Sequence, residues 1–313
     1  MTHTVRAARL LRHGAPLQVQ DVTLPEPGPA EVLVELLFAG VNPVDRYAVD
    51  GRVAPDGPLP RTAGSEACGT VAGQLVVVHG GGLGTTRDGV YAQAVIAPRD
   101  AVTEVPAGIA PEVAACVGVA GVTAYHLVTR ASVGRSDRVL VLGAGGGVGL
   151  PVVSFAASVG AQVWGQVGSA GKVDAVRAAG AADVAVSDAS GLADALGSWR
   201  PTVVVDPLGG PFVQVATELL PVGGRYIVFG TSAGAEVALN WQVVYRKSLQ
   251  LLGYGGLSLT VDERRQGTRD ALAAVAAGAL HIPVQQAYPL DGVNDAFARL
   301  ADRSVVGKLV VAL

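Results

Sequence analysis

The stretch VLVLGAGGGVGLPVV, residues 139–153, constrains the fold more than any other part of the chain. An apolar run, a glycine-rich turn and a second apolar run give the order strand, loop, helix. From residue 138 to 256, short apolar runs alternate with helical segments in the same way. This alternation is typical of β-α-β units whose parallel sheet is covered on both faces. The sequence therefore predicts an α/β fold with a doubly wound parallel sheet over residues 121–256.

The glycine loop fits the fingerprint G-x-G-x-x-G with one replacement. Ala144 stands at the first glycine position, while Gly146 and Gly149 keep the second and third. A loop of this kind between a strand and a helix directs backbone N–H groups and a helix N-terminus at a pyrophosphate. We therefore expect the loop to bind a dinucleotide through Ala144, Gly145, Gly146, Gly147, Val148 and Gly149. A second glycine run, residues 80–84, precedes no helical segment and is expected to be a loop between strands.

The residues after the second strand distinguish NAD from NADP. NAD-binding proteins usually carry an acid about 20 residues beyond the glycines, but no acid occurs here before Asp174. Gly168, Ser169 and Lys172 occupy this stretch instead, and small donors with a cation suit a 2′-phosphate. The structural alternative is that Lys172 is a solvated residue in the first turn of a helix. The missing carboxylate favours NADP as the cofactor.

The rest of the chain has a different pattern. Residues 1–120 are β-rich and interrupted by loops containing Pro and Gly, which predicts a mostly antiparallel domain. The C-terminal part has one amphipathic helix and a closing strand, GKLVVAL, which we expect to pack on the N-terminal domain. The predicted domains are residues 1–120 with 257–313, and residues 121–256.

Composition excludes several classes of function. Of the 313 residues 16% are charged, and the net charge of −3 gives no basic footprint for a nucleic acid. Glycines interrupt the long uncharged run after residue 139, so it is expected to be buried core and not a membrane span. The N-terminal residues have no apolar core of a signal peptide. We expect a cytoplasmic protein with a small-molecule partner, and with neither a nucleic acid nor a membrane as partner.

Several motifs resemble the medium-chain dehydrogenase/reductase superfamily. They are VLVLGAGGGVG, GSAGK, VVVDPLGG, LLPVGGRYIVFG and VGKLVVAL, while AGVNPVDRYAVDG and PRTAGSEACGTV are similar to the zinc-free, zeta-crystallin-like quinone oxidoreductases. The resemblance implies a GroES-like β-rich catalytic domain plus a Rossmann domain that binds NADP, with the active-site cleft between them. It also implies a homodimer formed by edge strands of the Rossmann sheets, expected at LQLLGY.

The same resemblance bears on metal binding. Zinc alcohol dehydrogenases of the superfamily bind the catalytic metal through a Cys in the first motif and through Gly-His-Glu in the second. This sequence has Asn42-Pro43-Val44-Asp45 and Gly64-Ser65-Glu66 at these places. The two cysteines cannot form a four-thiolate site, and none of the five histidines has a partner at ligand spacing. We expect no metal.

The resemblance also implies which side chains surround the nicotinamide. Asn42 is expected to donate an amide N–H to the substrate oxygen, and Tyr47 to donate a hydrogen bond or a proton. The alternatives are that Asn42 only forms a turn before Pro43 and that Asp45 caps a short helix. Further cofactor contacts are implied, with a helix start, a strand end or surface cover as alternatives, for Thr123, Phe229, Gly230, Thr231 and Lys308.

The implied activity is hydride transfer from NADPH to a quinone or an activated alkene. Two alternatives stay open: an enoyl or enone (2-alkenal) reductase of fatty-acid or secondary metabolism, and a non-catalytic NADPH-binding protein. One departure from the family affects the substrate. Residues 71–73 lead almost directly into the next strand, and about a dozen residues that relatives carry are missing. The outer pocket wall is therefore not defined by the resemblance.

Overall fold

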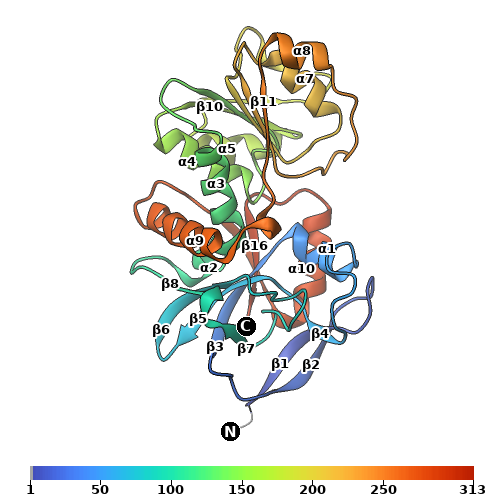
Figure 1. The fold of residues 1–313 in the computed structure, drawn as a ribbon, viewed down its shortest axis with the longest axis vertical. Coiled ribbons are helices and arrows are strands. Elements are labelled where there is room, and N and C mark those ends of the chain that lie inside the picture. The colour runs from blue at the N-terminus through green and yellow to red at the C-terminus, as the bar shows by residue number, and fades with distance from the viewer. Residues whose placement is uncertain (1–2) are drawn as a thin grey trace. The chain divides into compact units, whose positions relative to one another are not determined.

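The computed structural model describes residues 3–313, which divide into two compact units (Figure 1). Unit 1 contains the described residues up to 122, residues 259–276 and residues 282–313. Unit 2 contains residues 123–258 and 277–281. Among helices of residues 3–313, none has the length and apolar character needed to cross a membrane.

Unit 2 is built on a parallel sheet. Its strands, in spatial order, are β11 (Asp183–Val186), β10 (Gln162–Val167), β9 (Arg138–Val141), β12 (Val203–Asp206), β13 (Arg225–Val228) and β14 (Gln250–Gly253). Numbered along the chain, this is the order 3-2-1-4-5-6 of the Rossmann fold. The predicted α/β class with a doubly wound parallel sheet is confirmed.

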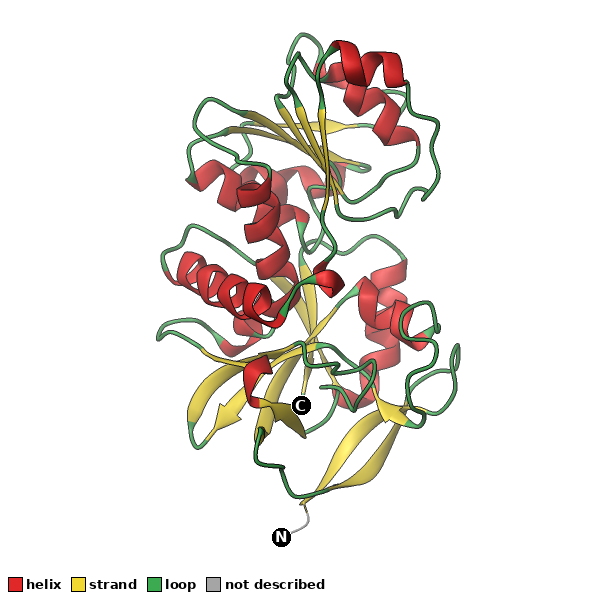
Figure 2. Cartoon of the chain, viewed as in Figure 1, coloured by secondary structure: helices red, strands yellow, loops and turns green. Residues whose placement is uncertain are grey.

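Helices of unit 2 connect these strands (Figure 2). They are α3 (Val122–Arg130), which begins at the unit boundary, α4 (Gly149–Ser158), α5 (Val173–Ala178), α6 (Leu192–Leu196), α7 (Pro211–Leu219) and α8 (Trp241–Arg246), with the 3₁₀ turns η3 (Ala170–Lys172) and η4 (Gly256–Ser258). Residues 139–141 of β9 are fully buried. A strand buried on both faces needs no polar alternation, which explains its continuous apolar run.

Unit 1 contains mostly antiparallel strands. The larger sheet has the order β15 (Val284–Pro289), β16 (Lys308–Ala312), β3 (Glu31–Val41), β5 (Glu66–Val71), β6 (Gln74–His79) and β8 (Val102–Glu104), and β7 (Ala94–Pro98) also pairs with β3. A smaller sheet has the order β2 (Gln18–Leu24), β1 (His3–Leu10) and β4 (Arg61–Thr62). Because β16 pairs antiparallel with β3, the closing strand of the chain completes a sheet begun near the N-terminus.

Helices of unit 1 pack around these sheets. They are α1 (Pro43–Val49), α2 (Pro111–Ala114), α9 (Val261–Ala276) and α10 (Val293–Ala301), with the 3₁₀ turns η1 (Arg99–Ala101) and η5 (Leu290–Gly292) and the π-helical turn η2 (Val117–Gly121). The apolar core includes Val34, Val78 and Val311 from the large sheet and Phe297 from α10.

Two loops of unit 1 correspond to features noted in the sequence, the short segment at residues 71–73 and the glycine run at residues 80–84. A two-residue turn, Ala72 at φ 49° and Gly73 at φ 80°, closes the β5–β6 hairpin, where Val71 pairs with Gln74. Positive φ at both central residues is the geometry of a type I′ turn, so the shortened segment ends in one of the tightest hairpin connections. The glycine run at residues 80–84 lies between β6 and β7 and leads into no helix, as predicted.

Candidate functional site

The predicted nucleotide loop connects β9 to α4 in unit 2. The N–H of Ala144 donates to the carbonyl of Gln166 at 2.9 Å, and the N–H of Gly143 donates to Gln166 Oε1 at 3.0 Å. Gly143 has a φ of 58°, a conformation that favours glycine. The loop is therefore held against the carboxyl end of β10 at its start.

Gln166 is a residue of this site that the sequence reasoning missed. Its side chain is buried, and its Nε2 donates to the carbonyl of Ser187 at 2.6 Å. One amide thus ties together segments at the carboxyl ends of β9, β10 and β11. The available signal was an amide near the end of a mostly apolar strand, whose first residue is also a glutamine, because a buried polar group needs partners.

The start of α4 fits the pyrophosphate of a dinucleotide. Val148 occupies the N-cap position and makes no capping bond, since its side chain has no acceptor. A Cβ at Gly149 would lie 2.6 Å from the carbonyl oxygens of both Gly143 and Ala144. The loop backbone therefore packs directly on the helix start, and the N-terminal dipole of α4 faces the loop. The strand–loop–helix arrangement that the glycine pattern predicted is present, and binding of a pyrophosphate by these residues stays a prediction.

The residues predicted for the 2′-phosphate lie next to this loop. Gly168 and Ser169 follow β10 and are exposed, and Ser169 starts the η3 turn without using its hydroxyl as a cap. A Cβ at Gly145 would lie 2.8 Å from Lys172 Cδ, so the Lys172 side chain packs across the glycine loop. The structure brings the cation and the loop together.

The other residues of unit 2 that were predicted to contact the cofactor lie in two separate segments. Phe229, Gly230 and Thr231 follow the carboxyl end of β13, and Thr123 is buried at the start of α3. Asp206, at the end of β12, accepts from the N–H groups of Leu208 and Gly209 and from the Tyr226 hydroxyl. It therefore stabilises the loop that follows β12. Contacts of Thr123, Phe229, Gly230 and Thr231 with a cofactor stay predictions.

Unit 1 contains a buried polar cluster that joins α1, β5, β16 and the segment before β7. We define it by its members: Asn42, Asp45, Ser65, Glu66, Tyr91 and Lys308. All except Ser65 are at most 3% exposed. Buried charges are stable only when they are paired and hydrogen-bonded, so the partners of each member decide what it can do.

Lys308, for which the sequence predicted a cofactor contact with surface cover as the alternative, is buried in this cluster. Its ammonium donates to Glu66 Oε1 and to the carbonyl of Val41, each at 3.1 Å, and to Asn42 Oδ1. These three acceptors use all three donors. Burial, the largest single cause, lowers the pKa of Lys308, but the charge and hydrogen bond of Glu66 together with the neighbouring Cys116 and Asp45 outweigh it, and the pKa is raised. The geometry makes Lys308 the counter-ion of Glu66 and leaves no donor for a cofactor.

Asn42 is also fixed inside the fold. Its Nδ2 donates to Glu66 Oε1 at 2.7 Å, its Oδ1 accepts from Lys308, and 2% of the residue is exposed. These partners and this burial argue against its predicted role as a donor to the substrate oxygen. Both carboxylate oxygens of Glu66 are also hydrogen-bonded, because the second oxygen accepts from the N–H of Val119 in the η2 turn at 2.7 Å.

Asp45 caps the start of α1 and also accepts hydrogen bonds from two other members of the cluster, Ser65 and Tyr91. Its Oδ2 accepts from the N–H of Asn42 at 2.9 Å and from the Tyr91 hydroxyl at 3.0 Å, and its Oδ1 accepts from the Ser65 hydroxyl at 2.6 Å. Burial raises the pKa of Asp45 to about 6, despite the opposing hydrogen bond from Ser65. The carboxyl group therefore changes its charge at about pH 6, above the usual range of an aspartate.

Tyr47 lies on α1, two residues beyond Asp45, and is partly exposed. The guanidinium of Arg52 lies over its ring, 4.0 Å from the centroid. This cation–π contact orients the ring. Its hydroxyl has the chemistry of a hydrogen-bond or proton donor, so the predicted catalytic role of Tyr47 stays a prediction.

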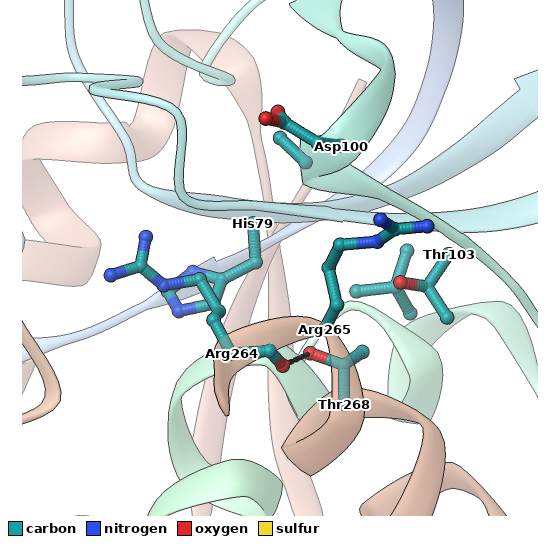
Figure 3. Close-up of a pocket in the computed structure, with 8 residues that line it drawn as sticks. His79, Asp100, Thr103, Arg264, Arg265 and Thr268 are labelled. Atoms are coloured by element: carbon teal, nitrogen blue, oxygen red, sulfur yellow. Dashed lines mark hydrogen bonds between the residues drawn. The ribbon is translucent and has the colours of Figure 1, made fainter. Parts of the chain in front are cut away.

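A further hollow in unit 1 is too small for a substrate. It has a free volume of about 0 Å³, with no room for a water molecule, and is lined by residues of β6, η1, β8 and α9, among them His79, Thr103 and Arg265 (Figure 3). Ligand pockets usually measure several hundred Å³. The Thr268 hydroxyl donates to the carbonyl of Arg264 at 2.8 Å, which is a bond within α9. The hollow is a packing feature between α9 and the sheet.

Comparisons with known proteins agree with this architecture. The zinc-binding dehydrogenase family matches residues 179–311. A zinc-type alcohol dehydrogenase-like protein of Schizosaccharomyces pombe is 31% identical over 290 residues, which cover 88% of this chain and 86% of that protein. Quinone oxidoreductase 1 of Escherichia coli is 29% identical over 324 residues, with 95% of this chain and 96% of that protein covered.

Similarity also extends to solved structures and to larger enzymes. The quinone oxidoreductase of Thermus thermophilus, solved also in complex with NADPH, aligns with a TM-score of 0.86 at 27% identity, covering 98% of this chain and 100% of that chain. A mycocerosic acid synthase-like polyketide synthase of Mycolicibacterium smegmatis is 30% identical over 301 residues, which cover 91% of this chain and 14% of that protein. With its Rossmann unit, its β-rich unit and these relatives, the chain belongs to the quinone oxidoreductase-like family of the medium-chain dehydrogenase/reductase superfamily.

Proposed function

We propose that the protein is an NADPH-dependent oxidoreductase that reduces a quinone or an activated alkene. The observation that carries the proposal is the cradle of unit 2, in which the glycine loop, the start of α4 and Lys172 lie together. NADPH supplies a hydride when it is bound. The loop N–H groups hold the pyrophosphate, and Lys172 with Ser169 recognises the 2′-phosphate.

Polar groups of unit 1 act on the substrate in this proposal. Reduction of a quinone or an enone leaves negative charge on the substrate oxygen, which requires nearby donors. Tyr47 is partly exposed, and its hydroxyl serves as such a donor. Thr123, Phe229, Gly230 and Thr231 are proposed to contact the nicotinamide half of the cofactor.

We further propose that the reaction needs no zinc. The chain has Asn42 and Ser65 where zinc relatives carry a thiolate and an imidazole, and both oxygens of Glu66 already accept hydrogen bonds. The ammonium of Lys308 already compensates the charge of Glu66. Full activity after treatment with a chelator supports this part, whereas loss of activity that added zinc restores contradicts it.

The decisive experiment follows NADPH consumption with two acceptors side by side, an ortho-quinone and a medium-chain 2-enal. Faster turnover of the quinone supports the quinone reductase function. Faster turnover of the enal supports the alternative of an enoyl or enone reductase, which the similarity to a polyketide synthase segment favours. Tight binding of NADPH with no turnover of either acceptor contradicts both and supports a non-catalytic role.

Tyr47→Phe distinguishes the two reductase functions further. An enone needs a proton at the α-carbon, whereas a quinone needs one only at oxygen, where another donor of the protein can replace Tyr47. We expect Tyr47→Phe to lower kcat by about 100-fold for enal reduction and by less than about 10-fold for quinone reduction. Equal, negligible losses with both acceptors would remove Tyr47 from the mechanism.

Lys172→Ala tests the choice of cofactor. Removal of a charge-assisted contact to the 2′-phosphate is expected to weaken NADPH binding by about 10- to 100-fold, since such bonds contribute about 1.5–3 kcal/mol. NADH lacks this phosphate, so its affinity should change less than about threefold. Fluorescence titration of each cofactor measures the effect. Lys247→Ala, just after α8, is the control, because its ammonium donates to two backbone carbonyls. Equal losses for the two cofactors would exclude the assigned role.

Homodimer formation through the sheet edge of unit 2 is proposed as well. The strand β14 ends the sheet, and α8 before it exposes Trp241 and Tyr245 by about two thirds. An open strand edge beside exposed aromatic residues is a frequent dimer surface. Light scattering supports the proposal if it gives twice the chain mass and contradicts it if it gives a monomer.

A further inference from the structure

Ser65 is the member of the buried polar cluster that reaches the surface. The other five members are at most 3% exposed, whereas Ser65 is partly exposed. Its hydroxyl donates to Asp45 Oδ1 at 2.6 Å. One hydroxyl therefore links an acid in the interior to the outside of unit 1, and a hydroxyl can donate and accept a proton at the same time.

The two oxygens of Asp45 have unequal surroundings. Oδ2 accepts two hydrogen bonds, from the backbone N–H of Asn42 and from the Tyr91 hydroxyl, at 2.9 and 3.0 Å. Oδ1 contacts only the Ser65 hydroxyl among the hydrogen bonds of the described chain. A proton on the carboxyl group is therefore placed at Oδ1. It then donates to Ser65 Oγ, and the hydroxyl hydrogen of Ser65 is turned away from Asp45.

We propose that Ser65 and Asp45 form a proton relay that protonates the substrate, with Ser65 in contact with the substrate oxygen and Asp45 acting behind it. The inference rests on the proposed function and deepens it, because it assigns the donor that the burial of Asn42 leaves open. Asp45 is a positioning residue in this scheme, since it acts through Ser65.

Hydride addition to the quinone or enone leaves an electron pair on the substrate oxygen. The Ser65 O–H bond breaks and a new O–H bond forms on that oxygen, while Ser65 Oγ takes the proton of Asp45 Oδ1. For a quinone this step yields the hydroquinone. For an enone it yields an enol, which then gains a proton at the α-carbon and releases the proton on oxygen to water. Asp45 is left as a carboxylate and recovers its proton from water through Ser65. NADPH is the only reductant, and it is oxidised to NADP⁺.

The charges around Asp45 suit this task. Burial is the main cause that raises its pKa to about 6, the Glu66 carboxylate raises it further, and the hydrogen bonds from Ser65 and Tyr91 and the charge of Lys308 oppose the change. His79 on β6 pairs through Nδ1 with the Ser65 carbonyl at 3.2 Å, and burial lowers the pKa of this histidine. An acid whose pKa lies near the working pH is an efficient proton donor.

Replacement of Ser65 tests the relay. We expect Ser65→Ala to lower kcat by about 100-fold with little change in KM, because the proton path is cut while the substrate surface is kept. Ser65→Thr retains a hydroxyl and should stay within about fivefold of the wild-type kcat. Ser190→Ala is the matched control, since it also removes a serine–aspartate hydrogen bond, 2.7 Å long, in unit 2. NADPH titration checks that each variant is folded.

The pH dependence separates a relay from a purely structural role. A proton donor must be protonated, so kcat of the wild type should fall as the pH rises through about 6, and Ser65→Ala should lose this dependence. An unchanged pH profile in Ser65→Ala, a kcat within threefold of the wild type, or a Ser65→Thr variant as slow as Ser65→Ala would each overturn the relay. Failure of the wild type to oxidise NADPH with either acceptor would instead overturn the proposed function.

Discussion

Lys308→Met is expected to lower the free energy of unfolding of the protein by about 3–5 kcal/mol. Methionine fills most of the lysine volume but leaves the carboxylate of Glu66, which is fully buried, without its cation. An uncompensated charge in the interior is far more costly than a lost hydrogen bond. Urea denaturation at neutral pH, followed by far-ultraviolet circular dichroism, measures the loss.

A double variant identifies the cause of this loss. In Lys308→Met with Glu66→Gln no charge is left between β16 and β5, and the Asn42 amide is free to turn because Lys308 no longer donates to Oδ1. The new glutamine side chain on β5 then accepts from the N–H of Val119 and donates to Asn42, so both contacts of the carboxylate keep a partner. We expect the double variant to regain at least half of the lost stability.

The control for this series is Lys247→Met. The ammonium of Lys247 donates to the carbonyls of Glu218 and Leu220 near the surface, so its loss should cost less than about 1 kcal/mol. If Lys308→Met also costs less than about 1 kcal/mol, the charge of Glu66 is compensated by other means. If the double variant is no more stable than Lys308→Met, the loss comes from packing and not from charge.

Local sequence patterns predicted much of the fold. The apolar runs that became β9 to β14 and the glycine loop before α4 are each encoded within a few residues, and the parallel order follows from their alternation with helices. The turn at Ala72 and Gly73 is local as well. Asp45 was considered as a helix cap and does accept from the Asn42 N–H three residues earlier.

The polar cluster could not be predicted in the same way. Lys308 is 242 residues from Glu66 along the chain, and only the pairing of β16 with β3 brings them together. The closing Gly-Lys pair therefore suggested a cofactor contact where the structure has an ion pair. Asn42 was assigned a donor role because its segment resembles one that lines the nicotinamide pocket, and the local sequence gives no sign that this amide is buried. Gln166 was missed because its partners lie in two other segments of unit 2, the loop at Gly143 and Ala144 and the segment at Ser187.

Gly149→Ala is expected to weaken NADPH binding by at least about 100-fold. A Cβ at this position lies 2.6 Å from two carbonyl oxygens, those of Gly143 and Ala144, and backbone atoms cannot move aside as a flexible side chain would. The loop must shift away from the start of α4, which separates the N–H groups that bind the pyrophosphate. Two such bonds to a charged group contribute about 1.5–3 kcal/mol each, and about 1.4 kcal/mol corresponds to tenfold in affinity.

Helix propensity acts in the opposite direction and is too small to prevent this loss. Alanine favours a helix over glycine by about 1 kcal/mol, so α4 itself should not be weakened. Gly134→Ala is the matched control, because a Cβ there has no atom within 4 Å and should leave NADPH binding unchanged. Fluorescence titration with NADPH, together with thermal unfolding of both variants, separates a displaced loop from an unfolded unit. A folded Gly149→Ala variant that binds NADPH within threefold of the wild type would mean that the cofactor does not bind at this loop.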